Sequence, residues 1–119
     1  MLKFGFPRKL RLTDNNDIRQ VCRKGRKISS PLAAVFFYPN QLGHSRLCVS
    51  VAKKQISKAW RRNTIKRIAR ESFRFQQHQL PHQDIVIVVF KPLAALDKKQ
   101  LREVINAQWQ KLIPYSKSA

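Results

Sequence analysis

A concentrated run of positive charge lies between residues 53 and 74. It contains nine Lys and Arg residues and a single acid, Glu71. On a helical wheel of about 100° per residue, one side is polar and basic, with Arg62, Asn63, Lys66, Arg67, Arg70 and Arg74. The opposite side is apolar, with Ile65, Ile68, Ala69, Phe73 and Leu80. Such a helix would pack through one face and bind phosphate through the other.

This density of one charge sign is more than solubility requires. Lys66 lies four residues from both Arg62 and Arg70, and like charges at this spacing destabilise a helix. A helix that only faces solvent more often alternates its charges. An Arg guanidinium can bind two phosphate oxygens at once, and Lys supplies a mobile point charge. The formal net charge of the chain is +19, so we expect a nucleic acid as its partner. An anionic membrane surface is the weaker alternative, because the apolar side of the helix is needed for packing.

The other reactive side chains form no catalytic or metal-binding motif. An autonomous nuclease needs a positioned acid and base or an activated nucleophile. The carboxylates are scattered, and Asp14, Asp17 and Asp97 are explained as residues that cap or begin helices. His78 and His82 are four residues apart, but a proline lies between them, and the two cysteines form no C-x-x-C pair. We therefore predict no catalytic residue and no metal ligand on this chain.

Local patterns predict the elements that position the basic helix. The chain has 119 residues, of which 43% are hydrophobic, and this predicts one domain. Residues 1–12 are basic and interrupted by a proline, which predicts an extended arm. A helix is expected from an N-cap at Thr13 or Asp14 to about Lys24, with Gly25 after its end. The patterns favour strands at 33–38, 47–51 and 85–90, and a short additional strand at 27–30.

Two further helices complete the predicted order. The basic helix is expected at 58–79, ended by Pro81. A last helix should start at an Asp97 N-cap and continue to about Leu112, before Pro114. The strand at 85–90 is apolar throughout, so we expect it to be packed on both faces. This order predicts an α+β sandwich with one mostly antiparallel sheet.

The central segment also resembles a known family. SVAKKQISKAWRRNTIKRIARESFR, at residues 50–74, is similar to the signature of bacterial ribonuclease P protein subunits. That signature has S-V-[SA]-K-K, a short variable stretch, and then R-N-R-I-K-R-x-x-R-E-x-[FY]-R. FPRKLRL at 6–12 and DIVIVVFKP at 84–92 resemble the basic N-terminal segment and the last strand of the family. The resemblance therefore covers nearly the whole chain.

Four positions depart from the family pattern. Thr64 replaces the second Arg of R-N-R, which removes one phosphate contact. Ile18 and Cys22 replace Phe residues that many members carry on the first helix, so base stacking from that side should be weaker. Cys48 replaces a Gly that is usual in the third strand.

The resemblance implies a specific fold. It is an α+β, two-layer sandwich with a mostly antiparallel four-stranded sheet and three helices, like a domain of a ribosomal protein. The basic helix region, at 53–79, lies in a left-handed βαβ crossover, a rare exception to the right-handed rule. Residues 1–119 would form a single RNA-binding domain.

The resemblance also implies a function. The chain would be the protein subunit of ribonuclease P, an endonuclease and hydrolase that removes the 5′ leader from precursor tRNA. Its partners would be the catalytic RNA and the leader, with no membrane partner and no stable protein partner. The catalytic centre and most of the Mg²⁺ would belong to the RNA. The N-terminus lacks the apolar region of a signal peptide, so we expect a cytoplasmic protein.

Two groups of binding residues follow from the resemblance. Those expected to bind the catalytic RNA are Arg62, Asn63, Lys66, Arg67, Arg70 and Arg74. Those expected to bind the leader or the tRNA are Arg8, Arg11, Ile18, Cys22, Phe36, Lys53, Lys54 and Lys91. Strand alternation turns Phe36 and Phe37 to opposite faces, so only one can line the leader cleft, and the sequence does not decide which. Trp60 and Trp109 are predicted to be packing residues.

The composition leaves other functions open. The main alternative is another small protein that binds structured RNA, of the ribosomal type and unconnected with tRNA processing. An autonomous nuclease is disfavoured because the chain lacks an acid–base constellation. Cleavage of precursor tRNA separates these classes, because only a ribonuclease P subunit should change cleavage by the RNA.

Overall fold

One four-stranded sheet forms the centre of the structure, a computed structural model that describes residues 8–76, 79 and 83–118. Its strands, in the spatial order β1-β2-β4-β3, are β1 (Arg26–Ser29), β2 (Ala33–Pro39), β4 (Gln83–Val89) and β3 (Arg46–Ser50). β2 is antiparallel to β1 and β4, whereas β3 and β4 are parallel. The predicted mostly antiparallel sheet is confirmed, and each strand begins and ends within two residues of its predicted position.

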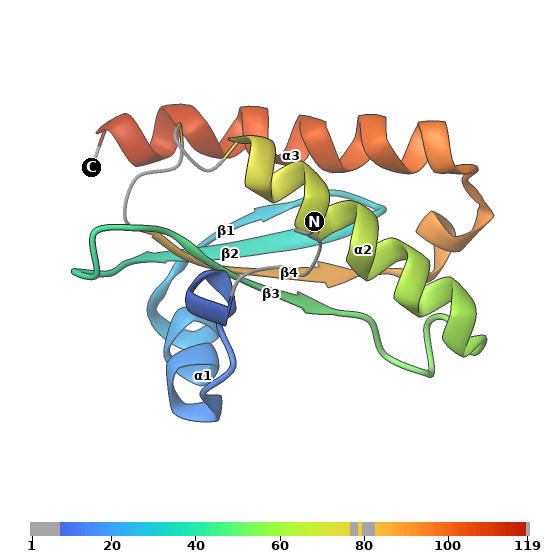
Figure 1. Ribbon diagram of the computed structural model, residues 1–119, viewed down its shortest axis with the longest axis horizontal. Helices are drawn as coiled ribbons and strands as arrows, with labels where there is room; N and C mark the ends of the chain where they lie inside the picture. The colour runs from blue at the N-terminus through green and yellow to red at the C-terminus, as the bar shows by residue number, and fades with distance from the viewer. Residues whose placement is uncertain (1–7, 77–78, 80–82, 119) are drawn as a thin grey trace.

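In the described part of the chain, three helices and two short 3-10 helices surround this sheet. They are α1 (Asn15–Lys24), α2 (Ala59–Gln76), α3 (Lys98–Ser118), η1 (Arg8–Leu10) and η3 (Lys91–Ala95). α2 and α3 lie over one face of the sheet, and α1 lies over the other (Figure 1). α2 connects β3 to its parallel neighbour β4, and the path in Figure 1 is left-handed, the rare sense that the resemblance implied.

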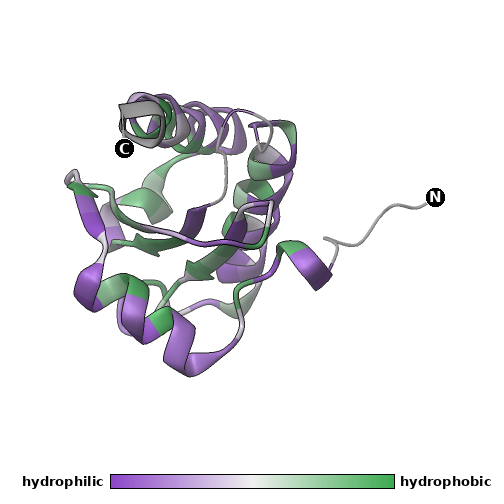
Figure 2. Cartoon of the chain, turned by 90° about the vertical axis from the view of Figure 1, so that its left-hand side faces the viewer, coloured by the Kyte–Doolittle hydropathy of each residue, from purple (hydrophilic) through white to green (hydrophobic). Residues whose placement is uncertain are grey.

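The main hydrophobic core lies between the sheet and the pair α2 and α3. Trp109 of α3 is 0% exposed, and its ring meets Phe73 of α2 edge-on at 5.8 Å between centroids. Its indole Nε1 donates a hydrogen bond to Ser72 Oγ at 2.7 Å, and Ser72 Oγ donates in turn to Asn106 Oδ1. Figure 2 shows hydrophobic residues gathered between these layers. The prediction that Trp109 packs inside is confirmed.

A smaller hydrophobic cluster occupies the opposite face of the sheet. Leu12, Val21 of α1 and Val86 of β4 are buried in it. Partly buried residues complete it, and these are Ile18, Phe36, Tyr38, Cys48 and Val88. β4 is therefore packed on both faces, as its apolar sequence predicts. α1 covers this face only in part, so Phe36 and Val88 remain partly exposed.

Both ends of α1 are fixed by local contacts. Asp14 is the N-cap, and its Oδ1 accepts hydrogen bonds from the backbone N–H of Asn16 at 2.8 Å and of Asp17 at 3.2 Å. Gly25 follows the last residue of α1. Its φ is −75°, a value that any residue can adopt. Its lack of a side chain matters for space, because a Cβ there would lie 2.5 Å from the carbonyl oxygen of Phe37 on β2. The end of α1 thus passes directly against the sheet backbone.

The predicted end of the last helix is wrong. Asp97 is the expected N-cap, since its Oδ1 accepts from the N–H of Gln100 at 2.8 Å. The helix, however, continues through Pro114 to Ser118 instead of stopping near Leu112. Pro114 removes one backbone donor, but both it and Gln110, whose carbonyl loses that donor, are exposed, so water can satisfy the carbonyl.

The expected N-terminal arm is anchored over its described part. Residues 8–10 form η1 instead of an extended segment, and Leu10 is buried in the main core. Leu12 is also buried, and its N–H donates to the carbonyl oxygen of Leu47 on β3 at 2.9 Å. Residues 1–7 lie outside the described residues, as do His78, Leu80, Pro81 and His82 from the predicted end of the basic helix.

Candidate nucleic-acid interface

α2 has the two faces that its sequence predicts. Ile65, Ile68, Ala69 and Phe73 are buried against the sheet and α3. Asn63, Arg67 and Arg74 are exposed, whereas Lys66 and Arg70 are half-buried. The helix therefore carries a basic face that solvent, or an anion, can reach.

Arg62 is less available than the sequence suggests. Its Nη1 donates to the carbonyl oxygens of Ile56 at 2.9 Å and Ser57 at 2.8 Å, in the loop that precedes α2. This guanidinium therefore holds the loop at residues 56–57 against the start of α2. Contact between Arg62 and RNA stays a prediction, and such a contact would share the side chain with this structural role.

A second candidate site is a cleft on the face of the sheet that α1 partly covers, with Phe36 of β2 on its floor. Phe36 points to this face beside Ile18 of α1, whereas Phe37 is 3% exposed in the main core. The structure thus decides which of the two aromatic residues faces the cleft. Lys27 Nζ lies 5.5 Å from the centre of the Phe36 ring, a cation–π contact at the edge of the floor. Cys22 is exposed on α1, on the same side.

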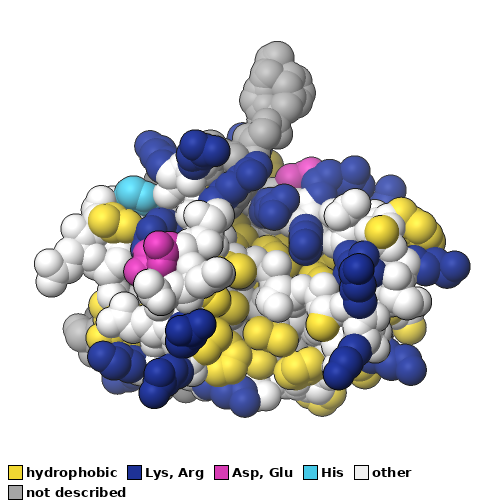
Figure 3. All heavy atoms as spheres, turned by 90° about the horizontal axis from the view of Figure 1, so that it is seen from below, with side chains coloured by type: hydrophobic (Ala, Val, Ile, Leu, Met, Phe, Trp, Pro, Cys, Tyr) yellow, Lys and Arg dark blue, Asp and Glu magenta, His cyan; other side chains and the backbone are white. Residues whose placement is uncertain are grey.

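The opposite border of this cleft comes from α2. Burial raises the pKa of the Cys48 thiol, the neighbouring Cys22 adds to this rise, and the charges of Lys66 and Arg70 oppose it. Burial also lowers the pKa of Arg70, and the charge of Arg11 lowers it further. Arg11 forms a β-bridge with Leu47 of the edge strand β3, and α2, which carries Lys66 and Arg70, packs against the same strand. Figure 3 shows this face as a hydrophobic hollow bordered by Lys and Arg side chains.

Three residues assigned to different RNAs therefore lie near one site. The sequence prediction gave Lys66 and Arg70 to the catalytic RNA and Arg11 to the leader. The structure brings all three into electrostatic range of one another or of Cys48. No signal in the sequence shows this, because it depends on α2 lying beside β3.

The remaining predicted contacts lie at one end of the sheet or on η1. Lys53 and Lys54 are exposed in the turn after β3, and Lys91 is exposed after β4. Because β3 and β4 are parallel, these segments are neighbours, and the N–H of Lys91 donates to Gln55 Oε1 at 2.9 Å. Arg8 is exposed on η1.

A buried ion pair that the sequence analysis missed fixes α1 to the sheet. Arg46 of β3 binds Asp84 of β4 through two bonds, Nε to Oδ1 at 2.9 Å and Nη2 to Oδ2 at 2.7 Å. Its Nη2 also reaches Asp17 Oδ2 on α1 at 3.4 Å. Asn40 Nδ2 donates to Asp84 Oδ1 at 2.7 Å. The hydrogen bond with Asp84 is the main reason why the pKa of Arg46 is raised. The sequence signal was an acid, Asp84, directly before an apolar strand.

Comparison with known proteins decides what this basic domain is. The family model described as Ribonuclease P matches residues 6–113. The chain belongs to the ribonuclease P protein family. The ribonuclease P protein component of Photorhabdus laumondii is 42% identical over 111 residues, which cover 93% of this chain and 93% of that protein. That of Proteus mirabilis is 43% identical, with the same coverage of both chains.

Solved structures of ribonuclease P proteins share the fold. The protein of Staphylococcus aureus matches with a TM-score of 0.77 and 26% identity, over 87% of this chain and 97% of that one. The protein of Thermotoga maritima matches with a TM-score of 0.74 and 29% identity, over 85% of this chain and 96% of that one. As a ribonuclease P protein component, the chain is the protein subunit of a ribonuclease that processes the 5′ end of tRNA. The alternative of a ribosomal-type protein is not favoured.

The position where this ribonuclease P protein departs from the R-N-R motif has a local explanation. Thr64 Oγ1 donates to the carbonyl oxygen of Trp60 at 2.9 Å, within α2. Arg61 does not supply the missing guanidinium at this face. Its Nη2 donates to the carbonyl oxygens of Ala94 at 3.0 Å and of Leu96, so it is held against η3.

The prediction for Trp60 is wrong. Its side chain is 63% exposed at the start of α2, whereas Trp109 is fully buried. The helix period places Trp60 on the polar side of α2, and this period, unlike the residue type, predicts its exposure.

No group of three or more His, Cys, Asp or Glu side chains among the described residues could hold a metal ion. None of the helices in the described part of the chain is long and apolar enough to cross a membrane.

Proposed function

We propose that the chain binds two RNAs, the catalytic RNA of ribonuclease P and the single-stranded 5′ leader of precursor tRNA. The observation that carries this proposal is the cleft with Phe36 on its floor and cations on its borders. Single-stranded RNA binds through bases that stack on aromatic side chains and a backbone that follows a basic groove. α1, the sheet and α2 together supply both features.

The exposed face of α2 is the surface proposed for the catalytic RNA. Asn63, Arg67 and Arg74 are exposed along it, and a structured RNA presents phosphates at many positions. Lys66 and Arg70, at the border of the cleft, would then neutralise charge on both RNAs. With a net charge of +19, the protein lowers the repulsion between two polyanions and thereby the Mg²⁺ concentration that they need.

The catalytic centre is proposed to lie on the RNA. Hydrolysis of the leader phosphodiester is metal-assisted, and Mg²⁺ held by the RNA supplies water activation and stabilisation of the leaving oxygen. The described residues of this chain offer no carboxylate cluster that fits such an ion. The chain's own residues bind and orient the substrate, and we place this work in the cytoplasm.

Cleavage of a precursor tRNA at low Mg²⁺ tests the proposal. We expect cleavage at the mature 5′ end only when the protein and a bacterial ribonuclease P RNA are both present. We also expect the protein to tighten binding of the leader-bearing substrate more than that of mature tRNA. Cleavage by the protein alone would place the catalyst on the polypeptide. If the protein tightened binding of both tRNAs equally, the proposal that the leader binds in the cleft would be contradicted.

Arg67→Ala tests the proposed surface of α2. We expect affinity for ribonuclease P RNA to fall roughly 3- to 10-fold, and the slope of log K against log salt to decrease by about 1, because one phosphate contact is lost. Filter binding at several salt concentrations measures both quantities. Arg102→Ala, an exposed Arg on α3, is the matched control and should change neither quantity. The same affinity and slope for Arg67→Ala as for wild type would contradict the placement.

A further inference from the structure

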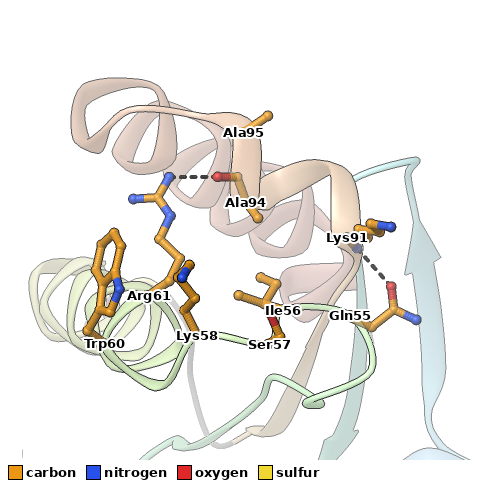
Figure 4. A pocket seen from close by; sticks show the side chains of 9 residues that line it. All are labelled: Gln55, Ile56, Ser57, Lys58, Trp60, Arg61, Lys91, Ala94 and Ala95. Atoms are coloured by element: carbon orange, nitrogen blue, oxygen red, sulfur yellow. Dashed lines mark hydrogen bonds between the residues drawn. The ribbon is translucent and has the colours of Figure 1, made fainter.

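An exposed indole lies in a pocket that the proposed function does not use. Trp60, 63% exposed, lines a cavity of ≈ 470 Å³ formed by the start of α2, the loop before it and η3 (Figure 4). This volume lies within the range of roughly 300–1,000 Å³ that is usual for small-molecule sites. An exposed tryptophan in such a setting is more typical of a binding surface than of the rest of a protein surface.

The indole is held beside a fixed cation. The guanidinium of Arg61 donates hydrogen bonds to the carbonyl oxygens of Ala94 and Leu96 on the far side of the cavity. Its Cζ lies 6.0 Å from the centre of the Trp60 ring, within the range of a cation–π contact. Because Arg61 is anchored at η3, the indole has a cation in a fixed position on one side.

The charges of the cavity select an anionic ligand. Lys58, Arg61 and Lys91 line it, and no Asp or Glu is among the lining residues. Ile56 is buried at its floor, and Gln55 and Ser57 add polar groups. A flat aromatic ring in a cavity lined by cations matches the base and the phosphate of an unpaired nucleotide.

The position of Trp60 on α2 favours RNA over other anionic partners. At about 100° per residue, Trp60 falls on the same stripe of the helix as Asn63, Arg67, Arg70 and Arg74. An RNA that follows the basic face toward the N-terminal end of α2 would therefore reach the indole next. An acidic peptide could also pair with the cations, but it would have no reason to follow this stripe.

We propose that Trp60 is a stacking platform for an unpaired base of the RNA that binds along α2. This inference rests on the proposed function, because it assumes that a structured RNA occupies the basic face. It adds a contact for an unpaired nucleotide beside the R-N-R region, with Lys58 and Lys91 as cations in the lining of the same cavity.

Affinity for a bacterial ribonuclease P RNA transcript gives the first test. We expect Trp60→Ala to weaken binding about 10-fold with an unchanged salt slope, because a stacking contact and no charge is lost. Trp60→Phe should recover most of the affinity. Phe75→Ala is the matched control, since Phe75 is 84% exposed on the same helix, away from the cavity, and its loss should have no effect. Thermal unfolding checks that the variants fold.

Tryptophan fluorescence gives a direct test. The chain has two tryptophans, and Trp109 is buried, so a Trp60→Phe variant reports the Trp109 background. We expect the RNA to quench wild-type emission more strongly than that of Trp60→Phe, in step with binding. The stacking proposal would be overturned if the RNA quenched wild type and Trp60→Phe equally and if Trp60→Ala bound the RNA with wild-type affinity.

The Arg67→Ala variant keeps the two proposals separable. If wild type does not bind the transcript, or if Arg67→Ala leaves the salt slope unchanged, the proposed surface of α2 fails. If Arg67→Ala behaves as expected but Trp60→Ala binds like wild type, only the stacking proposal fails. Weaker binding by both Trp60→Ala and Phe75→Ala would show a general aromatic effect and would also overturn it.

Discussion

Arg46→Ala will lower the free energy of unfolding by about 3 kcal/mol, because it leaves the carboxylate of Asp84 buried without its partner. The Asp84 side chain is 9% exposed, and both of its oxygens bind Arg46. Breaking a buried pair usually costs about 3–5 kcal/mol. The lower end applies here because 20% of the Arg46 side chain is exposed and Asn40 still binds Asp84.

Urea unfolding followed by circular dichroism measures this loss. Arg19→Ala, which removes an exposed cation from α1, should change stability by less than about 0.5 kcal/mol. The double variant Arg46→Met, Asp84→Asn should be more stable than Arg46→Ala alone, since no charge is then stranded. A loss for Arg46→Ala no larger than that for Arg19→Ala would show that the pair does not stabilise the fold.

The same ion pair matters for the proposed leader site. Arg46 also reaches Asp17, so it connects the wall formed by α1 to the two strands under the cleft. In conditions where Arg46→Ala remains folded, the position of α1 relative to Phe36 should be less defined. We therefore expect this variant to bind a leader-bearing substrate more weakly without loss of affinity for the catalytic RNA.

Local patterns predict those parts of the fold that local interactions determine. The buried and exposed faces of α2 follow from a period of 3.6 residues, and the caps at Asp14 and Asp97 follow from their side-chain oxygens. The end of α3 does not follow, because the cost of Pro114 depends on whether the carbonyl left without a donor can reach water. Sequence shows the proline and not its exposure.

The site depends more on tertiary structure. Alternation shows that Phe36 and Phe37 face opposite ways, but only the packing of α2 and α3 decides which one is in the core. Arg61 and Arg62 are indistinguishable from RNA-binding arginines in sequence. In the structure their guanidiniums hold backbone carbonyls of η3 and of the loop before α2. Charge alone therefore does not show which cations also have a structural role.

For Gly25→Ala, steric fit and backbone conformation predict changes of opposite sign in the free energy of unfolding. At φ −75° an alanine fits the backbone, and replacing Gly would stabilise the fold by about 0.4–1 kcal/mol through the unfolded chain. The added Cβ, however, would lie 2.5 Å from the carbonyl oxygen of Phe37 and would also clash with that of Val21. Both obstacles are backbone atoms, so α1 must move away from β2. We expect a net destabilisation of about 2–3 kcal/mol.

Gly43→Ala is the control that separates the two causes. Gly43 has φ +82° and no atom within 4 Å of an added Cβ, so its substitution brings backbone strain of about 1 kcal/mol without a clash. Chemical unfolding should therefore rank Gly25→Ala as the more destabilising variant, although only Gly43 has a positive φ. Because the displaced helix forms one wall of the cleft, Gly25→Ala should also weaken binding of the leader, and Gly43→Ala should not. The reverse ranking would mean that α1 can shift on the sheet at little cost, and that the cleft is not fixed by this contact.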